Sequence, residues 1–289
     1  MCFSEAVDTD ATEASIAVPR SFAAYEEAFD LPLYRPVKVT VVCDRGERLR
    51  DETDRGNLST RGVINATGTW ETAYIPDYSG ADRFGGRHLH TRDYRPAEEF
   101  AGQHVIVVGG AISAIQLLDE VSRVTTTTWV TRRPPDFREG PFTVERSRAA
   151  VELVEDRVSH SLPPRSVVSV TGLPVTPAIE AMRARGVLHR LPMFGEILDD
   201  GVRWPDGTFL RVDVILWCTG FRSSLDHLAP LMLREPGSGI TMTGKLATQV
   251  AMDPRVHLVG YGPSASTICA NRAGAVAARE LMAFLEEKR

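Results

Sequence analysis

The chain has 289 residues, with 33 Lys and Arg against 38 Asp and Glu, so its formal net charge is −5. This negative balance argues against a nucleic-acid partner, because phosphate binding needs a clustered excess of Lys and Arg. With 43% hydrophobic and 25% charged residues, the composition is typical of a folded soluble protein. The length favours two domains.

No segment has the features of a membrane span, a secretory signal or a metal site. The longest apolar stretch, 105–118, is interrupted by Ser113 and Gln116 and is shorter than the ~20 residues that a bilayer requires. The N-terminus is acidic, whereas a secretory signal begins with basic residues. We therefore expect a cytoplasmic protein without a membrane partner. The four cysteines form no C-x-x-C pair and no metal-ligand spacing with histidines: Cys2, Cys43, Cys218 and Cys269.

The first predicted elements are a leader and a short helix. Residues 1–20 are acidic, rich in Ala, Ser and Thr, and lack apolar periodicity, so we expect a disordered leader. Ser21 is predicted to cap a helix that ends before Pro32. Three aromatic residues fall on one face of this helix: Phe22, Tyr25 and Phe29.

Two groups of short β-rich segments follow the same plan. The predicted strands span residues 37–42, 48–53 and 62–65 in the first group, and 192–198, 202–204 and 212–216 in the second. Each group ends in an apolar strand that runs into Thr-Gly and then an aromatic residue. The two endings are Thr67-Gly68 before Trp70, and Thr219-Gly220 before Phe221. This repetition indicates an internally duplicated architecture.

Between the two groups, the pattern predicts a strand–helix–strand unit. Residues 103–108 form an apolar run typical of a buried parallel strand, a helix is expected over 112–123, and a second strand ends at Thr131. This is the size of a βαβ unit. Residues 134–177 are rich in proline and are expected to be crossover and surface structure. A last helix is predicted over 272–287 from its apolar stripe.

The turn after the first strand of this unit is a candidate nucleotide site. In such a turn, glycines let the backbone approach a pyrophosphate, while the helix start presents free N–H groups to it. Here Ala111 takes the place of the second glycine, and its Cβ is expected to crowd a phosphate. The alternative is a tight turn without a ligand. The predicted binding residues are Gly109, Gly110, Ala111, Ile112, Ser113 and Ala114.

The residues after the second strand predict which nucleotide binds. An acidic residue there would accept hydrogen bonds from a ribose 2′-hydroxyl, but this chain has Thr131, Arg132 and Arg133. Two guanidinium groups suit a 2′-phosphate through charge-assisted hydrogen bonds. We therefore expect NADPH rather than NADH, the alternative being that both arginines are only solvated surface charge.

A spaced pattern before this unit resembles a known family fingerprint. Phe84, Gly86, His90 and the pair Tyr94-Arg95 follow the spacing F-x-G-x-x-x-H-x-x-x-Y-R. In this pattern the chain resembles the flavin-containing monooxygenases and the Baeyer–Villiger-type monooxygenases. The local alternative is that His90 is a structural hydrogen bonder and Tyr94 a packed aromatic residue.

The resemblance implies an α/β fold with two Rossmann-like, three-layer dinucleotide-binding domains. An NADPH-binding domain, 97–211, would be inserted into an FAD-binding domain formed by 21–96 and 212–289. Residues 258–267 resemble the stretch that brings a helix start to the flavin. The resemblance therefore implies FAD contacts at both Thr-Gly pairs and in this stretch: Thr67, Gly68, Thr219, Gly220, Gly260, Gly262 and Thr267.

The sequence departs from the family at the start of the FAD domain. That domain opens with its own Gly-rich turn, whereas the first glycine here is Gly46. We therefore expect an incomplete FAD domain, with NADPH as the cofactor and FAD binding impaired.

The resemblance implies hydride transfer from NADPH to FAD, followed by O₂ activation and oxygen transfer to a small organic or soft-nucleophile substrate. No catalytic side chain, substrate or oligomeric state is predicted. Two other readings stay open: a thioredoxin-reductase-like enzyme, which would need a redox dithiol, and a non-catalytic or regulatory NADPH-binding remnant of the family.

Overall fold

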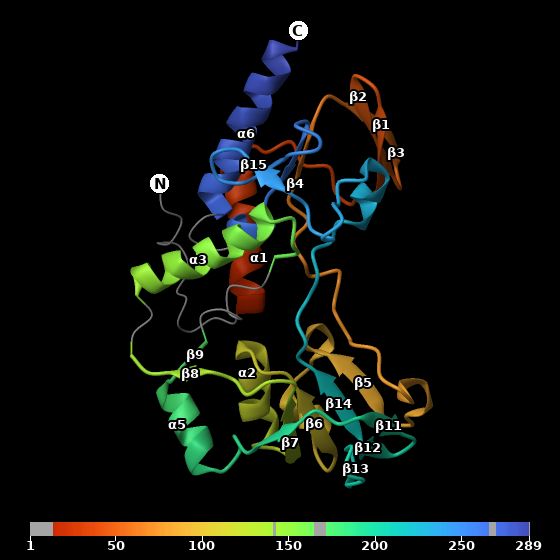
Figure 1. Ribbon diagram of the computed structural model, residues 1–289, viewed down its shortest axis with the longest axis vertical. Coiled ribbons are helices and arrows are strands. Elements are labelled where there is room, and N and C mark those ends of the chain that lie inside the picture. Colours follow the sequence, from red (N-terminus) through yellow and green to blue (C-terminus); the bar gives the residue numbers. More distant parts are fainter. Residues whose placement is uncertain (1–13, 141–142, 165–171, 266–269, 289) are drawn as a thin grey trace.

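The structure is a computed structural model, and it describes residues 14–140, 143–164, 172–265 and 270–288. The described residues form two bodies joined by two extended segments (Figure 1). We call residues 76–140 and 172–217 the insert body. The outer body consists of the described residues 14–65, 143–164, 226–265 and 270–288. The joining segments, 66–75 and 218–225, are called the linkers.

The insert body is built on a five-stranded parallel sheet in the order β10-β7-β6-β14-β5. Its central strands are apolar and buried because both faces of the sheet are covered. All four residues of β14 are buried. The strands are β5 (Arg87–His90), β6 (His104–Val108), β7 (Thr126–Thr131), β10 (Arg190–Pro192) and β14 (Val214–Trp217).

Two different layers cover this sheet. On one face, side chains of α2 (Ile112–Val121) and α5 (Pro177–Ala184) pack against Val105 and Val107 in one core. On the other face, Ile106 and Val108 pack against an antiparallel meander in a second core. That meander consists of β11 (Glu196–Leu198), β12 (Gly201–Arg203) and β13 (Phe209–Arg211). The predicted α/β fold with a parallel, three-layer Rossmann-like unit is confirmed in this body.

The outer body has a smaller sheet in the order β15-β16-β17-β4. Only β17 and β4 are parallel, and β4 is an edge strand. The strands are β4 (Val63–Asn65), β15 (Met242–Thr243), β16 (Gln249–Val250) and β17 (Val256–Leu258). A separate meander, β1 (Val39–Arg45), β2 (Arg48–Thr53) and β3 (Gly56–Thr60), shares the core of this body.

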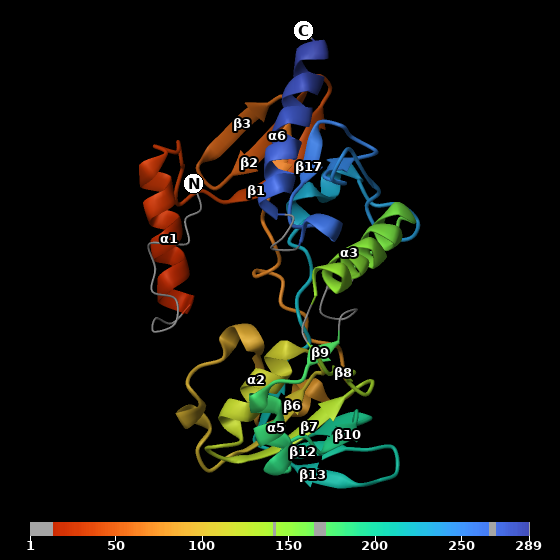
Figure 2. The same cartoon turned by 90° about the vertical axis from the view of Figure 1, so that its left-hand side faces the viewer.

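Three long helices belong to the outer body: α1 (Ala14–Ala28), α3 (Val144–Ser159) and α6 (Ala270–Glu287). Figure 2 shows α6 lying along the sheet, whereas α1 stands beside the body. The short pieces are β8 (Phe137–Arg138), paired with β9 (Leu173–Pro174), and the 3₁₀ turns η2 (Ala81–Arg83), η3 (Thr91–Asp93), η4 (Ala97–Phe100), η5 (Asp226–Leu231) and η6 (Gly262–Ser264).

The same error affects both predicted meanders. Residues 62–65 and 212–216 were predicted as the third strands, but they are β4 and β14, each of which pairs in parallel within the main sheet of its body. The true third strands, β3 and β13, were missed because each is short, mostly exposed and close to a Gly-containing turn. The corrected plan is still duplicated: a meander, then a parallel strand, then Thr-Gly.

The prediction of a disordered leader over residues 1–20 was wrong for its last part. Helix α1 begins at Ala14, so residues 14–20 are helical and Ser21 lies inside the helix instead of capping it. Residues 1–13 lie outside the described residues. Of the three aromatic residues predicted to share one face, Phe22 and Phe29 are more than half exposed.

Three elements belong to a different body from the domain to which the sequence analysis assigned them. Strands β5 and β14, assigned to the FAD domain as parts of 21–96 and 212–289, are both in the sheet of the insert body. Helix α3, assigned to the NADPH domain as part of 97–211, contributes Val158 to the core of the outer body. Strands β5 and β14 lie in the insert body because the chain crosses between the bodies at the Thr-Gly segments, before β5 and after β14. Helix α3 lies in the outer body because the chain leaves the insert body between β8 and α3 and is back in it at β9.

Candidate functional site

The turn between β6 and α2 is held rigidly by backbone contacts. Gly109 has a φ of 146°, and a Cβ there would collide with the carbonyl oxygen of Cys218. Its N–H donates to the Val130 carbonyl at 3.0 Å. Its carbonyl accepts from the indole N–H of the buried Trp129 at 2.7 Å. Only glycine fits this position without strain.

The start of α2 is open to solvent. Ala111, the N-cap residue, has an extended backbone and provides no side-chain cap. Gly110, Ile112 and Ser113 are exposed, whereas Ala114 is buried against the sheet. The first N–H groups of a helix have no partner within the helix, so an uncapped exposed start can bind an anion.

The two predicted nucleotide-specifying arginines lie at the end of β7, and both are exposed. Thr131, just before them, is buried, and its hydroxyl donates to the carbonyl of Arg133 at 2.7 Å. Arg190 of the adjacent strand donates to the carbonyl and the hydroxyl of Thr131, at 3.1 and 3.2 Å. Arg190 was not predicted as a site residue, because nothing in its local sequence indicates that β10 pairs with β7.

The two Thr-Gly linkers run antiparallel and are hydrogen-bonded to each other. Tyr74 N–H donates to the Gly220 carbonyl at 3.0 Å, and Arg222 N–H donates to the Thr72 carbonyl at 2.8 Å. A third bond joins Ser224 N–H to the Gly68 carbonyl at 2.9 Å. We call residues 66–75 and 218–225, joined in this way, the linker ribbon.

Side chains strengthen this ribbon. The rings of Trp70 and Phe221 stack with their centroids 5.5 Å apart. The Arg222 guanidinium lies 4.1 Å from the ring centroid of Tyr74. The hydroxyl of Thr219 donates to the Tyr74 carbonyl. The two predicted Thr-Gly segments are therefore brought together, and the aromatic residue that follows each of them is part of the contact.

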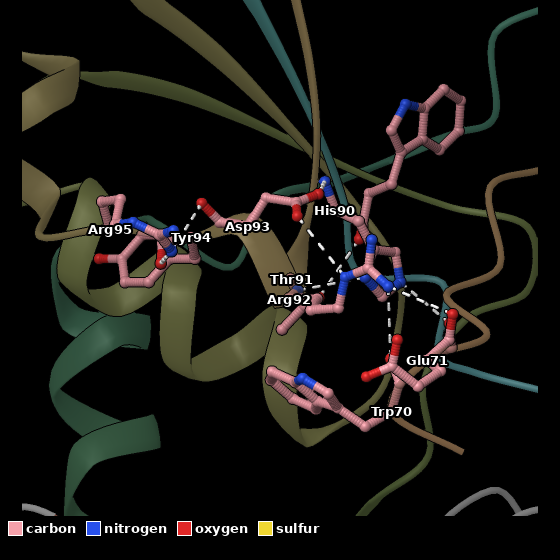
Figure 3. Close-up of polar contacts among 10 residues, drawn as sticks. Trp70, Glu71, His90, Thr91, Arg92, Asp93, Tyr94 and Arg95 are labelled. Carbon is pink, nitrogen blue, oxygen red and sulfur yellow. Dashed lines mark hydrogen bonds and ion pairs between the residues drawn. The ribbon is translucent and has the colours of Figure 1, made fainter. Parts of the chain in front are cut away.

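His90 of the fingerprint, in the insert body, is hydrogen-bonded to the linker ribbon (Figure 3). His90 is 1% exposed. Its Nδ1 accepts from the Arg92 N–H at 3.1 Å, so Nε2 carries the proton and donates to the Gly220 carbonyl at 2.9 Å. Burial lowers the pKa of His90, and the hydrogen bond to Gly220 opposes this shift. The neutral ring is therefore the form that the structure stabilises.

Tyr94 of the fingerprint and Arg92, which lies between His90 and Tyr94, also make structural contacts. The Arg92 guanidinium donates to the carbonyls of Trp70 and Glu71, at 3.5 and 3.3 Å. The Tyr94 hydroxyl donates to Glu120 at 2.8 Å, and the phenol pKa is raised, mainly by burial. These contacts tie the fingerprint to the first linker and to α2.

The predicted flavin-side glycines lie beyond the parallel strands of the outer body. Val259 N–H donates to the Asn65 carbonyl at 2.8 Å, so the ends of β17 and β4 lie side by side. Gly260 has a φ of 85°, and a Cβ there would meet open space. Gly262 also has a positive φ. Thr267 lies outside the described residues.

The described residues contain no group of His, Cys, Asp and Glu that could hold a metal ion. Among the cysteines that the structure describes, Cys43 is in β1 of the outer body and Cys218 follows β14. Burial raises the pKa of the Cys218 thiol to about 12, so it is protonated at neutral pH. These two residues do not form the dithiol that a thioredoxin-reductase-like enzyme would need. None of the described helices is long and apolar enough to span a bilayer.

Comparison with known proteins identifies relatives of this chain. The pyridine nucleotide-disulphide oxidoreductase family model matches residues 18–148. The structure of the flavin-containing monooxygenase from Stenotrophomonas maltophilia is 33% identical in sequence, with a TM-score of 0.75. The match covers 93% of this chain and 78% of that one.

Two curated relatives match over shorter segments. Senecionine N-oxygenase of Tyria jacobaeae is 31% identical over 181 residues, which are 63% of this chain and 30% of that protein. Trimethylamine monooxygenase of Pelagibacter ubique is 46% identical over 52 residues, 18% of this chain and 12% of that protein. The chain thus spans less than a third of the length of these two relatives. The long structural match, together with the glycine turn, the fingerprint and the paired Thr-Gly linkers, shows that the chain belongs to the flavin-containing monooxygenase family of oxidoreductases.

Proposed function

We propose that this chain is an NADPH- and FAD-dependent oxidoreductase that transfers oxygen to a small organic molecule. The observation that carries the proposal is the uncapped start of α2, which lies beside two exposed arginines at the end of β7. An open helix start suits a pyrophosphate, and paired guanidinium groups suit a 2′-phosphate. This combination supports NADPH as the nucleotide of the insert body.

Each part of the insert body has a role in this proposal. The backbone N–H groups of Ile112 and Ser113 bind the pyrophosphate, and Gly110 lets it approach. Arg132 and Arg133 bind the 2′-phosphate, and no acidic residue stands at the end of β7 to favour NADH. Thr131 does not bind the nucleotide through its hydroxyl, which is already bonded to Arg133 and Arg190.

The outer body supplies the proposed flavin side. Gly68 and Gly260 follow the two parallel strands, and no atom would meet a Cβ at either position. This open backbone suits close approach by a cofactor, and we propose Gly220, Gly262 and Thr267 as further contacts. Bound FAD supplies the acceptor for the NADPH hydride and the centre that activates O₂.

The linker ribbon holds the two bodies in one orientation. Hydride transfer requires the donor and acceptor rings to be close and aligned, and small displacements reduce its rate strongly. The backbone bonds of the ribbon and the His90 contact to Gly220 therefore serve catalysis by positioning. Neither His90 nor Tyr94 is assigned a proton-transfer role.

The double variant R132A/R133A tests the nucleotide assignment. We expect NADPH affinity to fall about 10- to 100-fold, because a hydrogen bond to a charged group contributes about 1.5–3 kcal/mol. NADH affinity should change much less, since NADH has no 2′-phosphate. Both affinities are measured by calorimetric titration.

A matched variant, R45A/R55A, removes two exposed arginines from the outer body and controls for the change in overall charge. It should leave the preference for NADPH intact. Equal loss of NADPH and NADH binding in R132A/R133A would refute recognition of the 2′-phosphate by these residues.

A further inference from the structure

A chain of polar side chains lies where the linker ribbon enters the outer body. His227 of η5 has its Nε2 at 2.8 Å from Oδ1 of Asn65, the last residue of β4. The Asn65 amide nitrogen is 3.1 Å from the Thr67 hydroxyl. That hydroxyl donates to the carbonyl of Ser224, on the second linker, at 2.7 Å. A continuous path of hydrogen bonds thus runs from η5 to both linkers.

The direction of each hydrogen bond follows from its neighbours. The Thr67 hydroxyl has one proton, which it gives to Ser224, so it accepts from the Asn65 amide N–H. This fixes Asn65 with its Oδ1 toward His227. The His227 Nε2 therefore carries a proton and donates it, whereas Nδ1 has no hydrogen-bond partner among the described residues.

A buried carboxylate accompanies this path. Asp51 of β2 is only 6% exposed, and its Oδ1 is buried without a hydrogen-bond partner in the described part of the chain. Asp51 and Asp226 are the charged groups that act on His227, and both favour its protonated ring, opposing the lowering of its pKa by burial.

We infer that His227 is a positioning residue that anchors the linker ribbon to the outer body through Asn65 and Thr67. The arrangement mirrors the other end of the ribbon. There, the Nε2 of His90 donates to the Gly220 carbonyl and anchors the ribbon to the insert body. Each end of the ribbon is therefore held by one histidine acting as a hydrogen-bond donor.

The anchor itself is a property of the folded chain. Its consequence for catalysis rests on the proposed function, because only hydride transfer between the bodies makes their orientation matter. The two parts are tested separately, first on the protein without nucleotide or flavin and then on the reaction.

The first experiment is hydrogen exchange, followed by mass spectrometry, of peptides that cover residues 66–75 and 218–225. In H227L, these amides should exchange about tenfold faster, since a lost hydrogen bond of about 1.4 kcal/mol corresponds to that factor. H227Q should keep the wild-type rates, because the Gln amide can still donate to Asn65. H189L, which changes an exposed histidine of the insert body, serves as the control.

T67V provides an independent variant at an exposed position, in case H227L does not fold. It removes the hydroxyl that joins Asn65 to Ser224 and should also accelerate exchange in the ribbon. Unchanged protection in T67V and in folded H227L would overturn the inference. So would equal loss in H227Q and H227L, because the donated hydrogen bond would then not be what matters.

The second experiment measures anaerobic reduction of added FAD by NADPH. H227L should reduce the maximal rate at least threefold while leaving the KM for NADPH unchanged, and H227Q should restore it. A rise in KM alone would contradict a positioning role. If the wild-type protein reduces no flavin, the proposed function fails, while the exchange experiment still decides whether the anchor exists.

Discussion

Both bodies contain a meander followed by a parallel strand and Thr-Gly. The parallel strand is much more buried in the insert body than in the outer body. In the insert body, β14 lies between β6 and β5, and all its residues are buried. In the outer body, β4 pairs only with β17, and Ile64 in its middle is 39% exposed. A strand with neighbours on both edges and layers on both faces gains far more apolar burial than an edge strand.

In the outer body, an ion pair connects the segment before β17 to the meander. Arg255, just before β17, is 2.7 Å from Asp253 and 3.1 Å from Asp44 of the meander. The Arg255 guanidinium lowers the pKa of the Asp44 carboxyl. Asp44 is exposed, so this second pair contributes little to stability. The comparison indicates that the insert body is the stable scaffold, and that the outer body is the part more easily opened.

A matched pair of isoleucines tests this difference most strongly. Ile215 of β14 is fully buried, so I215A should destabilise the protein by about 2–5 kcal/mol. I64A should cost less than about 1 kcal/mol, because the β4 side chain is partly in solvent already. The free energies come from urea unfolding followed by the fluorescence of Trp129, Trp204 and Trp217, which all lie in the insert body.

Circular dichroism should be recorded on the same samples, because it reports on both bodies together. A cost for I64A as large as that for I215A would show that burial in the two parallel strands is equivalent, and the comparison would fail.

Neighbouring glycines in the nucleotide turn provide a second test. G109A forces a Cβ into the carbonyl of Cys218 and places alanine at a φ of 146°, so a cost of about 1–3 kcal/mol is expected from backbone strain alone. G110A meets only ordinary contacts and has no positive φ, and its stability should remain close to that of the wild type. Thermal unfolding of both variants, with NADPH titration alongside, measures the effect.

Since Gly110 faces the proposed pyrophosphate, G110A should weaken NADPH binding although it folds normally. Normal stability of G109A would show that the turn is less rigid than its hydrogen bonds indicate.

The pH dependence of stability is the smallest expected effect. Burial lowers the pKa of His90, so the unfolded chain binds a proton more readily than the folded chain. The contribution of His90 to the free energy of unfolding is therefore fully present at neutral pH. It is lost as the pH falls below about 6.5 toward the lower pKa of the folded state. His90 contributes a slope of at most about 1.4 kcal/mol per pH unit in this window.

H90Q keeps a donor for the Gly220 carbonyl but does not titrate in this range, so its urea-unfolding free energy should depend less on pH between 7 and 5. A slope identical to that of the wild type would show that His90 is not held neutral. His104, His227 and His257 also have pKa values lowered by burial, so they contribute to the slope in the same direction.

The parts of the fold with strong local signals were predictable. The run 103–108 and the helix 112–123 correspond to β6 and α2, and the second strand of the unit ends at Thr131 as expected. These elements combine a continuous apolar run or a helical period with a glycine turn. Residues in β3 and β13 have no such signal, since they are short and mostly exposed.

The residues that the sequence could not bring together are those joined only by tertiary contact. Arg190 reaches Thr131 because β10 pairs with β7, and His227 reaches Asn65 across 162 positions of the chain. The Thr-Gly pairs were recognised as a repeat, but their pairing as one ribbon follows from the insertion of one body into the other. The roles proposed for the turn residues and for Arg132 and Arg133 remain predictions.

The most direct test of the account is the visible absorption spectrum of the purified protein prepared with FAD, recorded before and after anaerobic addition of NADPH. We predict a bound-flavin spectrum that is bleached by NADPH, and bleached much more slowly by the same concentration of NADH. NADPH binding without any bleaching of flavin would contradict the proposed function, and would indicate instead a member of the family that binds the nucleotide without using it for reduction.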